Sequence, residues 1–295
     1  PTVKNPQKGY LFSANQKPVN QTYQYNLYGY YALYRNRILD DKLSEKSKFS
    51  PSDFMKLQLS NYDLLAKEAL PVMIKCIDKS LLTPAEKEVF EKLSIWDYND
   101  NHDAIEPILF YSWWGNFYGE CWDELNEYPV LKPNYETTLR LLEKESNNIY
   151  FDNKSTPETE TWKHALLKSL KLVLGRYLKT EKKHGKTNWG IYKEVAFNHY
   201  TGIPAFGRQS LNCGGSSNCI NAITPDWGPG WRMIVEFTKN KPVAWGHNPC
   251  GQSGNPFSDY YCNGINSWEK GNYRKLIFYS EPDINKTTNQ VYIFH

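Results

Sequence analysis

The sequence predicts an α+β protein, with a helical middle and a sheet-forming end, and three observations lead to this class. Apolar residues recur at helical spacing over much of residues 40–180. Within that region Ser50, Thr83 and Thr156 each precede a proline, which is the pattern of a helix start. After residue 180, short apolar runs separated by Gly, Asn, Ser and Pro replace the helical spacing. This order favours a helical region inserted between strands of one sheet.

The first part of the chain combines a short predicted strand with predicted helices. Residues 10–13 read as the strand, and residues 25–43 carry apolar side chains at helical spacing. Pro71 is expected to kink or split the helical run of residues 61–77, because proline lacks an amide hydrogen and its ring clashes with the preceding turn. Further helices are predicted over residues 105–125, 135–145 and 156–179.

Two of the helix starts carry an additional signal. Ser50 is followed at the third position by Asp53, and Thr83 by Glu86. A hydroxyl and an acid at this spacing can each bond the other's backbone amide, which is the capping box. Both helices should therefore begin at the proline.

The sheet-forming end is organised around residues 228–271. Residues 231–237 are apolar nearly throughout, as a strand covered on both faces would be. A turn at residues 240–242 predicts that this strand pairs with residues 243–245 as a hairpin, and an ordered Gly- and Asn-rich loop follows. The other strand candidates are residues 207–213, 219–223, 274–280 and 291–294.

Composition limits the classes of protein that the chain can represent. Its 295 residues, 40% hydrophobic and 23% charged, suffice for one large globular domain or two ordinary ones. A net charge of +3, with no basic run that interleaves aromatics, argues against a nucleic-acid partner. No apolar stretch is long enough to span a bilayer. Because Pro1 is not an initiator methionine, we expect a processing site or another boundary there, and nothing follows about export.

The six cysteines lack the CxxC spacing of a zinc site. Cys213 and Cys219, and Cys250 and Cys262, lie in loop-rich sequence where a local disulfide could form. Cys76 and Cys121 lie in helical sequence and are expected to be buried thiols. The sequence leaves the disulfides open.

Several motifs, in order along nearly the whole chain, carry a resemblance to a known family. They are NPQKGYLFSAN at residues 5–15, LSIWD at 93–97, NWG at 188–190 with His199, GGSSNCINA at 214–222, GPGWRMIVEF at 228–237, and GQSGNPFS at 251–258 with Trp268 and Gly271. Together they resemble the penicillin acylase (penicillin amidase) family of N-terminal-nucleophile hydrolases.

This resemblance implies a fold and a place within a larger protein. The family has a four-layer αββα sandwich with a helical excursion. Residues 1–295 would be the C-terminal half of its β chain, with residues 1–40 and 180–295 as the sheet-forming core and residues 41–179 as the helical region. The implied partners are the α chain and the N-terminal part of the β chain.

The resemblance also implies a mechanism and its residues. The family's nucleophile is the first residue of the mature β chain, and its α-amine is the base. Pro1 has no hydroxyl, so this chain alone is expected to be inactive. Asn15 matches the family's oxyanion-stabilising asparagine, and Arg35 its site arginine, with Arg37 as the alternative. Gln16 stands where many members have a second asparagine.

No cofactor and no metal are expected. Some family members bind a structural calcium through carboxylates, but the matching position here is Asn26, whose amide is a weaker ligand. Asp97 and Asp103 lack the glycine and the terminal glutamate of an EF-hand loop, so we interpret them as part of a turn before a helix. No helix follows Gly214 and Gly215 to make them an anion cradle.

The predicted function is that of a fragment of a bacterial, periplasmic or secreted N-acyl amidohydrolase. By resemblance its small substrates are penicillins, N-acyl homoserine lactones or other N-acyl amines. Residues 260–264 depart from the family's His-Tyr-x-Asp-Gln pattern, which motivates an alternative: an inactive member acting as a binding or scaffolding protein. The 22 Tyr and 10 Trp motivate a second alternative, a carbohydrate-binding module.

Overall fold

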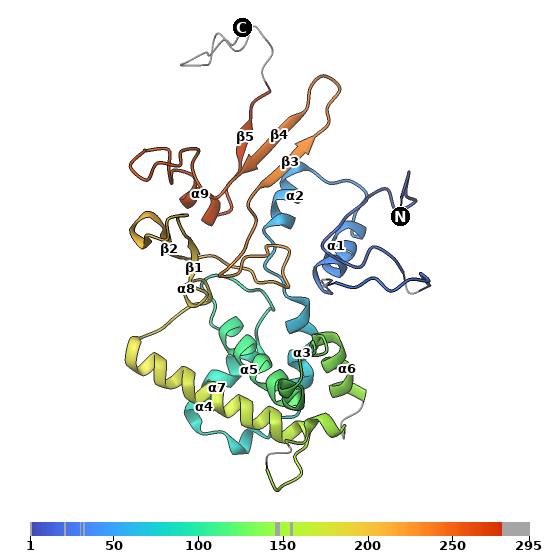
Figure 1. Cartoon of the computed structure of the whole chain (residues 1–295), viewed down its shortest axis with the longest axis vertical. Coiled ribbons are helices and arrows are strands. Elements are labelled where there is room, and N and C mark those ends of the chain that lie inside the picture. The colour runs from blue at the N-terminus through green and yellow to red at the C-terminus, as the bar shows by residue number, and fades with distance from the viewer. Residues whose placement is uncertain are drawn as a thin grey trace. The chain divides into compact units, whose positions relative to one another are not determined.

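The computed structural model describes residues 2–20, 22–29, 31, 33–144, 148–153 and 156–278. The chain divides into two compact units (Figure 1). The first consists of Pro1–Ser47 together with Ser60–Gly228, and the second of Lys48–Leu59 together with Pro229–His295. Each unit is built from segments that are distant in sequence.

The first unit is mainly helical. Its helices are α1 (Arg35–Ser44), α3 (Leu64–Lys75), α4 (Pro84–Ser94), α5 (Glu106–Cys121), α6 (Tyr135–Lys144), α7 (Trp162–His184) and α8 (Trp189–Tyr192), with the 3₁₀ turns η1 (Lys79–Leu81), η2 (Asp123–Glu127), η3 (Ile149–Phe151) and η4 (Pro204–Phe206). Its small sheet pairs β1 (Val195–Phe197) with β2 (Arg208–Leu211) in antiparallel fashion.

Helix α5 forms the centre of the first unit's core. It packs against α7, α4, α6 and α8, and Figure 1 shows α5 and α7 side by side. Because neighbours surround it, α5 buries Phe110, Trp113, Trp114 and Phe117 together. Full burial of a large apolar side chain contributes about 1.5–3 kcal/mol to folding.

The predicted capping boxes are confirmed. The hydroxyls of Ser50 and Thr83 accept hydrogen bonds from the amides of Asp53 and Glu86, whose carboxylates accept from the cap amides in return. Helices α2 (Pro51–Gln58) and α4 therefore begin at their prolines. The expected helix start at Thr156 is wrong. Its hydroxyl donates to the carbonyl of Asn153 instead, and α7 begins after the capping box of Thr161 and His164.

Two predictions in the first part of the chain are also wrong. Residues 10–13 form no strand, and the helix predicted over residues 25–43 begins only at Arg35. Gly29 has a φ of +148°, which no α-helix contains, so apolar spacing alone was insufficient there. Pro71 lies inside α3 without splitting it.

The second unit combines α2, the short helix α9 (Ile265–Glu269) and a three-stranded antiparallel sheet. The sheet order is β3 (Arg232–Glu236), β4 (Val243–His247) and β5 (Arg274–Leu276). The predicted hairpin is confirmed, with Arg232 opposite His247 and Glu236 opposite Val243. Helix α2 packs on β3, and the Gln58 side chain donates to the carbonyl of Met233 at 3.2 Å.

The expectation that residues 231–237 are covered on both faces is wrong for this chain. Ile234 is buried, but Met233 and Phe237 are 47% and 86% exposed. Arg232 is buried because its guanidinium lies over the Trp268 ring, 4.9 Å from the centroid, and donates to the Trp268 carbonyl at 2.9 Å. One face of β3 is therefore apolar and open.

The remaining strand predictions differ in outcome. Residues 208–211 and 274–276 are strands, whereas residues 219–223 form a bend and an irregular segment. There the Asn221 amide donates to the carbonyl of Ser60 instead of to a sheet partner. Residues 279–280 and 291–294 lie outside the described residues.

Mixed helices and small sheets make the chain an α+β protein, as the sequence predicts. Among the residues described before Val195, the only strand-type pairing is the isolated bridge between Tyr62 and Asn99. In the described part of the chain, no helix has both the length and the apolar composition needed to span a membrane.

Candidate active-site residues

Asn15 lies in a tight turn of the first unit, where its backbone takes the left-handed conformation. Its φ is +61°, a region that asparagine tolerates better than most residues. The Gln16 side chain closes the turn, because its Oε1 accepts from the Ala14 amide at 2.6 Å and its Nε2 donates to the Phe12 carbonyl at 3.4 Å. Asn15 itself is exposed, so the turn presents its carboxamide outward.

Arg35, the first residue of α1, is in contact with Asn15. Its Nη2 donates to Asn15 Oδ1 at 2.7 Å. Because a guanidinium can only donate, the atom that faces it must be the amide oxygen, and the amide N–H₂ points elsewhere. The alternative, Arg37, pairs instead with Glu68, with Nη2 2.5 Å from Oε1. The structure thus brings the two predicted site residues together; their roles remain predictions.

The segment before the turn is held to α1 by one carboxylate. Lys8 Nζ lies 2.7 Å and 2.9 Å from the two oxygens of Asp40, and the Tyr10 hydroxyl donates to Asp40 Oδ1 at 3.0 Å. The hydrogen bonds from Lys8 and Tyr10 lower the pKa of Asp40. A surface hollow of about 380 Å³ adjoins the turn and is lined by Tyr10, Phe12 and Gln16 among others.

A second polar site, which we call the buried hub, lies deeper in the same unit. It consists of Asp63, Asp100, Tyr111, Lys193, Ser216 and Cys219. Asp63 and Asp100 are fully buried, and the Tyr111 hydroxyl contacts both, donating a short hydrogen bond to Asp63 and lying 3.3 Å from Asp100 Oδ2. The Tyr111 hydroxyl has one hydrogen for two carboxylate contacts, which favours a proton on Asp100 over a second ionised carboxylate.

The pKa values agree with this assignment. Burial and the neighbouring Asp63 hold the pKa of Asp100 well above its ordinary range, while burial raises the pKa of Asp63 to about 6. Burial lowers the pKa of Lys193 to about 8. Of the two acids, Asp100 therefore favours its protonated form more strongly than Asp63 does.

The hub joins several of the sequence motifs. Lys193 donates to the carbonyls of Gly214, Gly215 and Ile223 at 2.9, 2.7 and 3.2 Å, and Trp189 Nε1 donates to the Gly215 carbonyl at 2.9 Å. The two glycines thus cradle an ammonium group with their carbonyls. A Cβ at Gly215, whose φ is +79°, would lie 1.9 Å from the Asn221 carbonyl oxygen, so only glycine fits.

Sequence reasoning missed the hub. Asp63 and Asp100 were not recognised because their partners lie on α5 and on residues 216–219, far away in sequence. The available signal was an acid placed directly before a helix: Asp63 caps α3 by accepting from the Ala66 amide at 3.0 Å.

Asp97 accepts from the Asn99 amide at 2.9 Å, which fits the predicted turn before α5.

All six cysteines are free thiols in the structure, so neither local disulfide forms. The Cys219 sulfur instead lies 3.2 Å from Asp100 Oδ2 and 3.0 Å from the Asn61 carbonyl oxygen. Cys121 is buried and Cys76 half-buried. Within the described ranges, no group of three or more His, Cys, Asp or Glu side chains is arranged to hold a metal ion.

Comparisons with known proteins define the class. The α+β fold and the ordered motifs are consistent with the penicillin amidase family. The chain belongs to the penicillin amidase family, whose model matches residues 1–285.

The chain is similar to named acylases over most of its length. It is 25% identical to the acyl-homoserine lactone acylase QuiP of Pseudomonas syringae pv. syringae and 24% identical to that of Pseudomonas aeruginosa, in each case over 94% of this chain and 38% of the relative. It is 32% identical to the Pseudomonas fluorescens Pf-5 protein of the same name over 45% of this chain and 17% of that protein. The chain thus spans about 38% of the length of the relatives that it matches throughout.

Proposed function

We propose that this chain is the C-terminal part of the β chain of an N-acyl amidohydrolase and supplies its oxyanion-stabilising amide, Asn15. The observation that carries the proposal is the 2.7 Å hydrogen bond from Arg35 to Asn15 Oδ1. With the oxygen so engaged, the exposed Asn15 N–H₂ is oriented to donate to an oxyanion. Donors fixed in advance are the most effective, because they need no reorganisation as the charge develops.

In the proposed reaction a nucleophile outside this chain attacks the amide carbonyl of the substrate. Asn15 stabilises the resulting oxyanion, and the C–N bond breaks to release the amine and leave an acyl-enzyme. Water then attacks the acyl carbon, and the acid is released. Because the nucleophile lies elsewhere, we propose that residues 1–295 alone are inactive. No cofactor enters this reaction.

Two further observations support the remainder of the proposal. The similarity to relatives named acyl-homoserine lactone acylases supports N-acyl homoserine lactones as substrates, with penicillins and other N-acyl amines as the wider class. The open apolar face of β3, with Met233 and Phe237, fits burial by the α chain and the N-terminal part of the β chain in an αββα sandwich. We further propose a periplasmic or secreted location.

The test replaces Asn15 with Ala and with Asp in the full-length protein that contains this chain. Release of homoserine lactone from an N-acyl homoserine lactone is followed with an amine-reactive reagent. Loss of one oxyanion donor lowers kcat about 10²–10³-fold, with little change in KM. Asn20→Ala, an exposed residue on the same segment, serves as the matched control and should leave kcat unchanged.

An Asn15→Ala enzyme with wild-type kcat overturns the proposed role. The nucleophile is tested separately by intact-mass measurement and N-terminal sequencing of the full-length protein. If cleavage upstream of this chain exposes a Ser, Thr or Cys as the first residue, that result supports the proposed amidohydrolase function.

The second candidate is an inactive family member that binds or scaffolds. The observation that favours it is the departure of residues 260–264 from the family pattern. An uncleaved full-length protein without hydrolytic activity would establish this candidate in place of the enzyme.

A further inference from the structure

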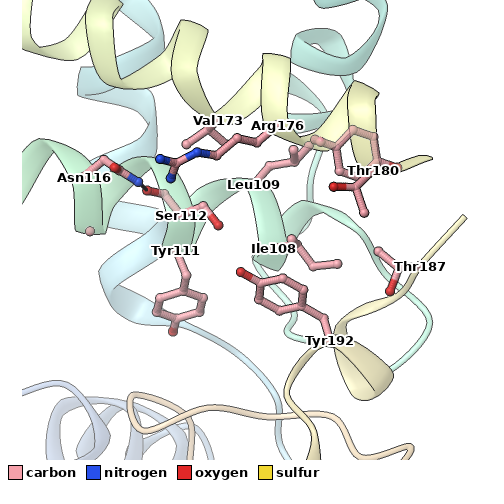
Figure 2. Close-up of a pocket in the computed structure, with 12 residues that line it drawn as sticks. Ile108, Leu109, Tyr111, Ser112, Asn116, Val173, Arg176, Thr180, Thr187 and Tyr192 are labelled. Atoms are coloured by element: carbon pink, nitrogen blue, oxygen red, sulfur yellow. Dashed lines mark hydrogen bonds between the residues drawn. The ribbon is translucent and has the colours of Figure 1, made fainter. Parts of the chain in front are cut away.

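A pocket of about 550 Å³ lies in the first unit (Figure 2). It is bounded by α5, α7 and the segment that contains α8. Its volume falls within the roughly 300–1,000 Å³ typical of small-molecule sites. Neither Asn15 nor Arg35 lines it, and Tyr111 is the one hub residue that does, so the proposed reaction leaves the pocket unexplained.

One end of the pocket is polar and positively charged. Figure 2 shows the Arg176 side chain extending from α7 toward Ser112 and Asn116 of α5. Among the described residues, Arg176 has no carboxylate partner and the Ser112 hydroxyl has no hydrogen-bond partner, whereas Asn116 Nδ2 donates to the Ser112 carbonyl at 2.7 Å. No Asp or Glu is among the lining residues, so this end favours an anion.

The other side of the pocket is apolar and aromatic. Ile108, Leu109 and Val173 are buried side chains that line it. Tyr111 and Tyr192 form an aromatic wall, since both stack on Trp189 with ring centroids 5.3 Å and 6.0 Å away. A stacked wall is rigid and presents apolar area at little entropic cost.

The remaining tyrosine in the pocket does not add a negative charge. The Tyr177 hydroxyl donates to Glu181 Oε1 at 3.4 Å, and burial, with Glu181 nearby, raises the pKa of Tyr177 to about 12. Glu181 itself does not line the pocket. Arg176, which lies between Val173 and Glu181 along α7, does line it. The lining is therefore cationic at neutral pH.

We propose that this pocket binds a monocarboxylate that carries an apolar tail. The carboxylate would pair with the Arg176 guanidinium, which offers donors in the fork geometry that carboxylates accept, and the Ser112 hydroxyl would add a donor. The tail would lie along Ile108, Leu109 and the tyrosine wall. The acid released by amide hydrolysis belongs to this ligand class, but the inference follows from the pocket alone and does not require the proposed function.

The experiment titrates octanoate into the full-length protein that contains this chain, with binding followed by calorimetry. Octanamide, which has the same tail without the charge, is the matched ligand. We expect octanoate to bind with a Kd tighter than about 1 mM and octanamide at least about tenfold more weakly. Arg176→Gln should remove that difference, while Lys171→Gln, an exposed cation on the same helix, should preserve it.

A second pair of variants tests the pocket itself. A Cβ at Gly115 or at Gly119 of α5 meets no atom within 4 Å, and only Gly115 lines the pocket. Both Gly115→Leu and Gly119→Leu improve helix propensity, so both should fold. Gly115→Leu should abolish octanoate binding and Gly119→Leu should not. Absence of binding at about 1 mM, equal binding of octanamide, or full binding by Gly115→Leu would overturn the proposal.

Discussion

At the scale of single residues, the orientation of Asn15 depends on one hydrogen bond. Arg35 engages the amide oxygen at 2.7 Å, and the left-handed backbone presents the side chain outward. The hydrogen bond joins residues twenty positions apart, so it is not visible in the local sequence. Arg35 and Arg37 differ by two positions on α1, yet one contacts Asn15 and the other contacts Glu68. The different partners of Arg35 and Arg37 predict different effects of replacing each arginine.

We predict that Arg35→Gln and Arg37→Gln separate activity from stability in the full-length protein. Arg35→Gln releases the Asn15 amide, and a misplaced catalytic group can cost about 10²-fold in kcat. Arg37→Gln should leave kcat within about twofold and lower stability by about 0.2–1 kcal/mol, because its ion pair with Glu68 is partly exposed. Steady-state kinetics and urea unfolding measure the two effects. The reverse pattern would assign the site arginine to Arg37.

At the scale of elements, a hydroxyl followed by an acid three positions later predicts a helix start correctly, whereas the hydroxyl–proline pair at Thr156 does not. The capping boxes at Ser50 and Thr83 are complete, and both helices begin as predicted. The missed elements are short: β1 has three residues and α8 four. Such segments depend on partners elsewhere. Trp189 of α8, for example, stacks on Tyr111 of α5 at 5.3 Å.

The cap of α4 provides a prediction at this scale. Thr83→Ala removes the hydroxyl that accepts from the Glu86 amide, and loss of such a cap costs about 1 kcal/mol of folding free energy. Thr83→Ser keeps the hydroxyl and should unfold at nearly the wild-type urea concentration. Equal stability of the Ala and Ser variants would show that the cap contributes nothing here.

At the scale of the whole molecule, the buried hub joins α3, α5 and residues 193–223 around two acids. The pKa of Asp100 is held well above its ordinary range, and that of Asp63 is raised to about 6. An acid whose pKa is higher in the folded than in the unfolded chain takes up protons on folding. These acids therefore make the free energy of unfolding fall as pH rises from about 4, near the unfolded pKa, through about 6.

We predict that Asp63→Asn and Asp100→Asn flatten this dependence. Asparagine is also a good helix cap, so Asp63→Asn retains the start of α3. The wild-type minus variant difference in unfolding free energy, measured by urea at several pH values, should decrease between about pH 4 and 6. Lys193 affects the free energy of unfolding in a separate, higher pH range, because burial lowers its pKa to about 8. A pH-independent difference for both variants would show that neither acid changes its proton affinity on folding.

The sequence by itself determined the α+β class, the capped helix starts, the β3–β4 hairpin and the family. These follow from signals within a few residues, such as a hydroxyl three positions before an acid, or from motifs read directly. It also identified Asn15 and Arg35 as candidates, through resemblance. Periodicity was insufficient in the described residues before Arg35, where Gly29 adopts a backbone that no helix contains.

Only the tertiary structure decided which distant groups meet. The contact between Arg35 and Asn15, the hub around Asp63 and Asp100, and the pocket between α5 and α7 all join segments separated along the chain. In the bend at residues 219–221, Asn221 likewise donates hydrogen bonds to the Ser60 carbonyl and to Asn61 Oδ1. The physical reason is that buried polar groups must find partners wherever the packed chain places them, and local sequence does not specify that placement.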